Sequence, residues 1–283
     1  MKFCLAMITR VRPLFLKASA LSILAALVIA GSDSAAKSII GQSSELTPVQ
    51  REIERQRQRL NSGEVEERRD ALMRLGNLRR PDASRVAAAG LSDVEPIVRV
   101  TAAHAILSLP PAEAVTLLGP LLQDKVEFVR REAAYALGET RSRTAVAALT
   151  NLLISDKDAG VRGAAAVALG IIGDESAVPA LSQVLVGRAE KKKKAKAAEN
   201  EFVMRAAARS LGQIRSRSAV DVLIATLAND SNDSDLRHEA ATALGLIGDP
   251  SAGPALQAAF ASGDPYLSEA ARESLRRLRI ARK

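Results

Sequence analysis

The sequence predicts an all-α protein, a right-handed α-solenoid of about six helical hairpins with N- and C-terminal capping helices. An arginine recurs six times in similar surroundings at a period of about 31 residues, which is typical of stacked helical repeats. Small and apolar residues follow each arginine at helical spacing. Aromatic residues make up only 2% of the chain, so the core must consist of Ala, Leu, Val and Ile, which suits close helix packing. The recurring arginines are Arg68, Arg99, Arg130, Arg162, Arg205 and Arg237.

The N-terminal segment is predicted to direct export. Residues 1–36 combine a basic start, an apolar run of 13 residues at 18–30 and small residues after it, a pattern typical of a secretory signal peptide. An uncleaved N-terminal anchor is the alternative, but a spanning helix needs roughly 20 apolar residues. We therefore expect an exported protein, periplasmic or extracellular, with a linker at 37–47 and a repeat solenoid at 48–283.

The first helix after the linker begins with a capping signal. Thr47 precedes Pro48, and Gln50 stands at the third helical position, so a capping box is expected there. The helix from Pro48 to about Leu60 is highly polar. It is therefore expected to cover the exposed end of the first repeat.

Six repeat units follow, each predicted to be a helical hairpin. Glycines near the end of the first helices are expected to let neighbouring helices approach closely, and Gly173 and Gly248 suit the left-handed position that ends a helix. Candidate N-caps of the second helices are Ser142, Asp174, Ser216 and Asp249. The unit ranges are 64–93, 94–124, 125–156, 157–187, 201–230 and 231–264, and a final helix from Pro265 caps the C-terminus.

One motif carries a family resemblance. The pattern Val-Arg-x-x-Ala-Ala-x-Ala-Leu-Gly begins at Val129 and again at Val161. It resembles HEAT repeats, specifically the short bacterial subtype called phycobilisome-lyase HEAT-like repeats, over residues 64–280. The resemblance implies the solenoid fold and leaves the activity open.

An acidic residue stands six positions before four of the arginines. In the resembled family such residues form a buried polar ladder between repeats, and an Asp there can accept from backbone amides and from a guanidinium fork. We interpret the arginines as structural ladder residues, with an anion-binding row as the alternative. The sixth unit departs, because Ser231 stands at the acidic position. The ladder residues are Asp93 and Arg99, Asp124 and Arg130, Asp156 and Arg162, Glu199 and Arg205, and Arg237.

The insertion at 188–200 breaks the repeat. It lengthens the spacing from Arg162 to Arg205 to 43 residues, and its run of lysines predicts a solvated loop or a helix extension. It is either a tolerated surface insertion or a contact for an anionic membrane or envelope polymer through Lys191–Lys196. Residues 188–201, residues 1–36 and the tail from Leu267 carry net charges of +3, +3 and +4, so the rest of the chain has a charge of −2 within the net +8 and is slightly acidic.

The side-chain inventory argues against catalysis, and no cofactor or metal is predicted. The chain has two histidines and one cysteine. Deoxyhypusine hydroxylase, a HEAT-like relative, binds two irons through several His-Glu pairs, and the single His238-Glu239 pair here provides too few ligands for them. The export signal and the scarcity of aromatic residues argue against a phycobilin lyase. The absence of Trp and the slightly acidic repeat body argue against nucleic-acid binding.

We therefore expect a monomeric, non-enzymatic protein–protein interaction scaffold of the bacterial cell envelope, with its partner on the concave face of the second helices. Two alternatives stay open: an auxiliary subunit or lyase- or hydroxylase-like enzyme, and a protein that docks on membranes through the lysine-rich insertion. The candidate partner-binding residues are Thr150, Asn151, Ser182, Gln183, Asp221 and Gln257, with Lys191, Lys192, Lys193 and Lys194 of the insertion.

Overall fold

The computed structural model describes residues 46–186 and 194–281, with side chains described over 46–186 and 201–278. Residues from Leu46 onward form one compact unit. The predicted signal peptide, nearly all of the linker, and Lys191, Lys192 and Lys193 lie outside the described residues.

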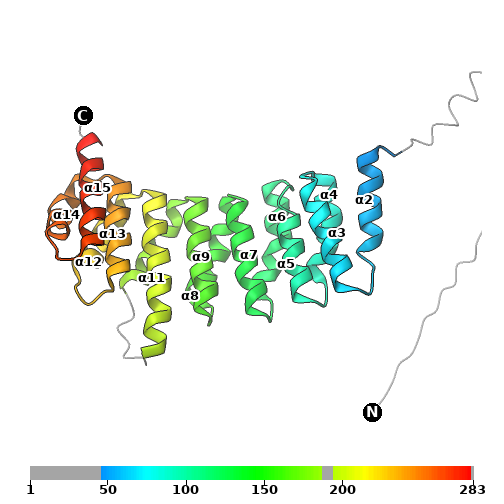
Figure 1. Cartoon of the computed structure of the whole chain (residues 1–283), viewed down its shortest axis with the longest axis horizontal. Coiled ribbons are helices and arrows are strands. Elements are labelled where there is room, and N and C mark those ends of the chain that lie inside the picture. Colours follow the sequence, from blue (N-terminus) through cyan, green and yellow to red (C-terminus); the bar gives the residue numbers. More distant parts are fainter. Residues whose placement is uncertain (1–45, 187–193, 282–283) are drawn as a thin grey trace, which may run out of the picture. The chain divides into compact units, whose positions relative to one another are not determined.

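The described chain is built from helical hairpins, which confirms the predicted all-α solenoid with capping helices (Figure 1). The first helices of units one to six are α3 (Val65–Asn77), α5 (Pro96–Ala105), α7 (Glu127–Glu139), α9 (Ala159–Ile172), α11 (Lys194–Ile214) and α13 (Ser234–Ile247). The second helices are α4 (Pro81–Ala87), α6 (Pro111–Leu118), α8 (Val146–Ser155), α10 (Val178–Val186), α12 (Val220–Ala228) and α14 (Gly253–Phe260).

Short 3-10 segments complete the second helices. In units one and two, η1 (Ala88–Ser92) and η2 (Gly119–Gln123) extend α4 and α6. In the later units, η3 (Arg143–Ala145), η4 (Glu175–Ala177), η5 (Arg217–Ala219) and η6 (Pro250–Ala252) precede α8, α10, α12 and α14. The first helices pack side by side in chain order and form one layer, and the second helices of units three to five pack mainly against the first helix of the next unit, α8 on α9, α10 on α11 and α12 on α13.

The two capping helices are α2 (Pro48–Arg59) and α15 (Pro265–Ala281). The capping box is confirmed, since the Thr47 hydroxyl accepts from the Gln50 amide and the Gln50 side chain accepts from the Thr47 amide. Ile53 and Gln56 are the buried residues of α2, so this polar helix covers the first unit with a narrow stripe. At the other end, α15 packs on α13 and α14.

The turn between the first and second helix differs from unit to unit. Gly173 and Gly248 adopt the predicted left-handed conformation, and Asp174 and Asp249 accept hydrogen bonds from the amides two residues on. The predicted capping by Ser142 and Ser216 is wrong. Their hydroxyls instead face the hydroxyls of Thr144 and Ser218, because a short serine side chain finds a nearer partner within the turn.

The insertion lengthens one helix. Because α11 begins at Lys194, it has 21 residues, whereas α9 has 14. The part of the insertion from Lys194 onward is therefore a helix extension, one of the two conformations that the sequence allows. In the part of the chain that the structure describes, no helix combines the length and the apolar character that crossing a membrane requires.

Glycines set the distance between neighbouring first helices. A methyl group added to Gly138 would lie 2.8 Å from Cα of Ala168, and one added to Gly212 would lie 2.7 Å from Cα of Ala243. Both glycines stand at the same position of their repeats and face the same position of the next repeat. The close helix packing predicted from these residues is thus present, and any larger residue would force the backbones apart.

We predict that Gly138→Ala destabilises the protein by about 1–3 kcal/mol, because the added methyl group meets backbone that cannot move without disturbing the next unit. Urea unfolding followed by circular dichroism measures the loss. Gly119→Ala is the matched control, since nothing lies within 4 Å of a methyl group added there. Equal midpoints for the two variants would contradict the role assigned to Gly138.

Candidate functional site

Among the described side chains, a ladder of arginines connects successive units. Arg99 donates from Nε and Nη2 to the two carboxylate oxygens of Asp124, at 2.7 and 2.9 Å. Its Nη1 donates to the carbonyl oxygens of Asp93 and Val94, at 2.7 and 3.1 Å. The guanidinium therefore joins the turn before its own unit to the turn before the next one. The Arg99 and Asp124 side chains are only 8% and 10% exposed.

The same arrangement recurs in units one and three. Arg68 binds Asp93 in a fork at 2.7 and 2.9 Å, and Arg130 binds Asp156 at 2.7 and 3.0 Å. The partner carboxylate thus lies 25 or 26 residues after the arginine. The acid six positions before an arginine contributes its backbone carbonyl instead. In the ladder, each of these arginines therefore binds the carboxylate of the next unit and backbone carbonyls of the turn before its own helix.

The ladder carboxylates have perturbed pKa values. Burial by itself would raise the pKa of Asp124, but hydrogen bonds from Arg99 and from the Val126 amide outweigh burial and hold the pKa below its usual value. Asp93 and Asp156 show the same balance, with a lowered pKa despite burial. The charged form is therefore the one that the fold stabilises.

The assignment of Arg205 to the ladder is wrong, whereas that of Glu199 stays a prediction. Buried Val203 corresponds to Val129 and Val161, and Gly212 contacts the next unit as Gly138 does, so Met204 occupies the arginine position of unit five. Arg205 lies one residue further on, is 36% exposed and pairs with the 75%-exposed Asp235 at 2.5 Å. The Glu199 side chain lies outside the described residues. Aligning the units on their glycines rather than on the arginine would have shown the shift.

The ladder loses both partners of its unit-five rung together. Met204 replaces the arginine, and Asn229 replaces the acid that such an arginine would bind. Like Asp124, Asn229 directly follows a second helix and accepts a hydrogen bond from the amide two residues further on. Arg237 of unit six binds the Leu227 carbonyl, in the last turn of α12, and Asp230 in the turn that follows. Arg162 donates to the carbonyls of Asp156 and Lys157, as the other ladder arginines do to their own turns.

The second helices present a different kind of surface. Asn151, Gln183, Asp221 and Gln257 are exposed there, as candidate binding residues must be. Thr150 and Ser182 do not point outward. Their hydroxyl oxygens are buried without a hydrogen-bond partner in the described structure, because position 150 of α8 and position 182 of α10 face neighbouring helices. Of the lysines proposed for binding, Lys194 lies in α11, but its side chain is not described.

The second helices of units three to six are almost free of charge. In α8, α10, α12 and α14, Asp221 is the sole ionisable residue. Ile154 and Val186 are 55% and 74% exposed on consecutive units. The first helices, by contrast, carry exposed ion pairs such as Arg205–Asp235 and Arg209–Glu239. The two faces of the solenoid therefore differ in chemistry.

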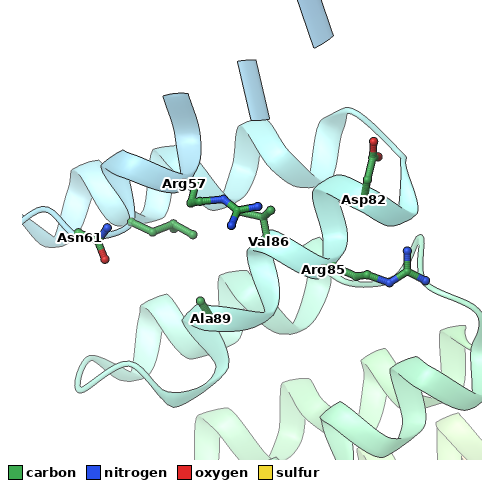
Figure 2. Close-up of a pocket in the computed structure, with 7 residues that line it drawn as sticks. Arg57, Asn61, Asp82, Arg85, Val86 and Ala89 are labelled. Carbon is green, nitrogen blue, oxygen red and sulfur yellow. The ribbon is translucent and has the colours of Figure 1, made fainter. Parts of the chain in front are cut away.

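A hollow of about 440 Å³ lies between α2 and the second helix of unit one. Figure 2 shows Arg57 extending toward Val86, while Arg85 extends away from Arg57. Arg85 is engaged by Glu113 through two hydrogen bonds, and Arg57 pairs with Glu54. The hollow is therefore open and its cations already have partners. Its lining residues are Arg57, Leu60, Asn61, Asp82, Arg85, Val86 and Ala89.

A second hollow, of about 310 Å³, lies between α13 and α15 on the first-helix side. His238, Tyr266, Glu269 and Glu273 are among the residues that line it. Glu239, next to His238, pairs with Arg209. Over the described ranges, no three His, Cys, Asp or Glu side chains gather as a metal ion would require.

Comparison with protein families gives the fold its name. A family model of HEAT repeats matches residues 53–137, 121–200 and 192–276, which is most of the chain. This chain belongs to the HEAT-repeat family. The recurring units, the inter-repeat ladder and the glycine contacts are thus the features of a HEAT solenoid in this sequence. A comparison with curated proteins returns no match.

Solved structures with similar folds include proteins of different kinds. The YibA protein of Escherichia coli is 20% identical, with a TM-score of 0.56 over 81% of this chain and 82% of that one. The CpcE–CpcF complex of phycocyanin lyase from Nostoc sp. PCC7120 is 25% identical (TM-score 0.47; 86% and 91% covered). Human deoxyhypusine hydroxylase is 22% identical (TM-score 0.41; 81% and 84% covered). The likeness to the YibA protein shows a shared fold and no activity.

We predict that Arg99→Met destabilises the solenoid by about 3 kcal/mol, since it leaves the buried Asp124 carboxylate without its partner. Arg205→Met is the matched control. It removes an exposed pair, so the expected loss is below about 1 kcal/mol. Urea unfolding of both variants at pH 7 measures the difference. An Arg205→Met loss as large as that of Arg99→Met would restore Arg205 to the ladder.

We also predict that stability falls as the pH drops below about 4. The ladder aspartates have an ordinary pKa of 3.8 and a lowered pKa in the folded state, so the unfolded state binds more protons in this range. Their contribution is fully present above the unfolded pKa and disappears as the pH passes the folded pKa. Urea midpoints between pH 7 and pH 2.5 test this, and Asp124→Asn should show a shallower decline. A midpoint that rises below pH 4 would contradict it.

Proposed function

We propose that this HEAT-repeat protein is a non-enzymatic scaffold that holds a protein partner on the face of its second helices. The observation that carries the proposal is the near absence of charge on α8, α10, α12 and α14. Folded proteins usually cover free surfaces with charged side chains, and a depletion of charge marks the centre of protein interfaces. Nothing in the packing of the units requires the outward positions of these helices to be neutral.

The partner chemistry follows from the exposed residues. Ile154 and Val186 offer apolar contact, and Asn151 and Gln183 offer one amide each in the turn before them. An amide side chain has both donor and acceptor atoms, so it can bind backbone groups of either kind. A neutral protein segment with apolar side chains fits this surface best, with its energy spread over several units.

The proposal includes a location in the cell envelope and the absence of catalysis. The location is supported by the basic and then apolar character of residues 1–36, which is typical of a secretory signal. The absence of catalysis is supported by the small supply of nucleophilic and metal-binding residues, with two histidines and one cysteine in 283 residues.

We predict that a photo-reactive amino acid at Gln183 cross-links one discrete protein in intact cells that produce this chain. Gln183 is exposed in the middle of the neutral face. The same amino acid at Met73 is the control, because Met73 is 53% exposed on a first helix. Mass spectrometry of the adducts identifies the partner. Identical adducts from both positions, or adducts from Met73 alone, would contradict the assignment to the second-helix face.

Charge insertion tests the same face with the partner identified in that way. Ile154→Lys with Val186→Lys should weaken binding about tenfold or more, since two lysines would be desolvated at the centre of the interface. Met73→Lys, at a similarly exposed apolar residue, should leave the affinity unchanged. Isothermal titration of the purified proteins compares the variants, and equal weakening by both would refute the proposed face.

A further inference from the structure

Three arginines occupy a backbone conformation that ordinarily belongs to glycine. Arg79, Arg141 and Arg215 have φ angles of 50°, 52° and 59°. They end the first helices of units one, three and five. In units four and six the same position holds Gly173 and Gly248, with φ angles of 72° and 76°. Three occurrences at one repeat position make this a pattern of the fold.

The left-handed conformation is energetically unfavourable for an arginine, so the requirements of the turn alone do not explain why arginines stand here. A side chain with a Cβ atom is disfavoured in the left-handed region, where glycine, and to a lesser degree asparagine, fits. A positive charge near the end of a helix is favourable, but an arginine in the last helical turn supplies it with ordinary backbone angles. Units four and six show that glycine serves the turn.

The three guanidinium groups are exposed and have no ion-pair partner among the described side chains. Their near neighbours behave differently. Arg80 pairs with Asp82, Arg143 with Asp174 and Arg217 with Asp249. Asp82, and Asp174 and Asp249 in the turns of the following units, are therefore already engaged by other arginines. Arg79, Arg141 and Arg215 remain as uncompensated positive charges.

The topology places these charges in a row. The first helices run parallel to one another, so their C-terminal ends lie along one edge of the solenoid, the upper edge in Figure 1. Neighbouring helices pack about 8–10 Å apart, so arginines on alternate units are separated by about 16–20 Å. An extended peptide covers that distance in about five or six residues. We call the row of Arg79, Arg141 and Arg215 the arginine edge.

We propose that the arginine edge binds an extended acidic segment of a protein, with its carboxylates grouped about six residues apart. Guanidinium groups bind carboxylates in a planar fork, which suits a partner with discrete acidic side chains. Glu175 lies in the unit-four turn, between the units of Arg141 and Arg215, and favours such a partner over a continuous anionic surface. A lipid bilayer would meet this acid as well as the arginines and would be repelled by it.

The arginine edge is separate from the neutral second-helix face. It requires charge, whereas that face excludes charge, and the three arginines lie in turns rather than in second helices. The two surfaces can therefore succeed or fail independently in experiments.

The test uses a synthetic peptide with three Glu-Glu pairs that begin six residues apart, joined by Ser and Thr, and measures its binding to the full chain by fluorescence anisotropy. The variant Arg79→Gly, Arg141→Gly, Arg215→Gly removes the charges and installs the residue that units four and six already have. We expect it to fold and to bind the peptide about tenfold more weakly, because each exposed charge contact contributes a few-fold.

The matched control removes three arginines that lie outside the turns of the arginine edge, with Arg55→Gln, Arg131→Gln and Arg209→Gln. It changes the net charge equally and should leave binding unchanged. A peptide of the same composition with its glutamates in one block should bind the wild type less tightly. Equal binding by the two triple variants would overturn the proposal. So would tighter binding to phosphatidylglycerol vesicles than to the peptide, which would assign the edge to membranes.

Discussion

The fork between an arginine and the aspartate of the next unit is the interaction that fixes the angle between successive units. In units one to three a single guanidinium holds three things together: its own helix, the turn before it and the turn after it. Because the fork is planar and the carbonyls are fixed, it tolerates little rotation of one hairpin against the next. Apolar packing alone would allow neighbouring units to slide, since hydrophobic contact has no direction.

The ladder and the glycine contacts hold different parts of each first helix in place. The ladder lies at the start of the helix, and the contact of Gly138 with Ala168 or of Gly212 with Ala243 lies near its end. Together they fix both ends of neighbouring helices, so the first-helix layer is well defined without large side chains. Exposed first-helix positions then carry ion pairs, such as Arg205 with Asp235 and Arg209 with Glu239. The outward positions of the second helices take part in neither contact, so they are free to differ.

The sequence predicts the hairpins, the caps and the close-packing glycines well, because these depend on residues near in sequence. Gly173 and Gly248 end helices for the local reason expected of them. The errors arise where a tertiary neighbour decides. Arg205 has the expected identity at nearly the expected place, yet the packing of Val203 and Gly212 assigns the ladder position to Met204. Thr150 and Ser182 look like surface residues, but the neighbouring helices bury their hydroxyls. Arg79, Arg141 and Arg215 are missed because left-handed arginines have no local signal.

The missing rung in unit five shows why ladder residues must change in pairs. An arginine without its acid, or an acid without its arginine, leaves a buried charge uncompensated, whereas replacing both removes the desolvation cost as well as the attraction. Met204 and Asn229 together meet that condition. The glycine contact continues across the same junction through Gly212 and Ala243, so the helices still approach closely. The ladder is therefore a constraint on angle rather than a requirement for stacking, and its loss is tolerated at the unit whose first helix, α11, is also the one that extends beyond the regular repeat length.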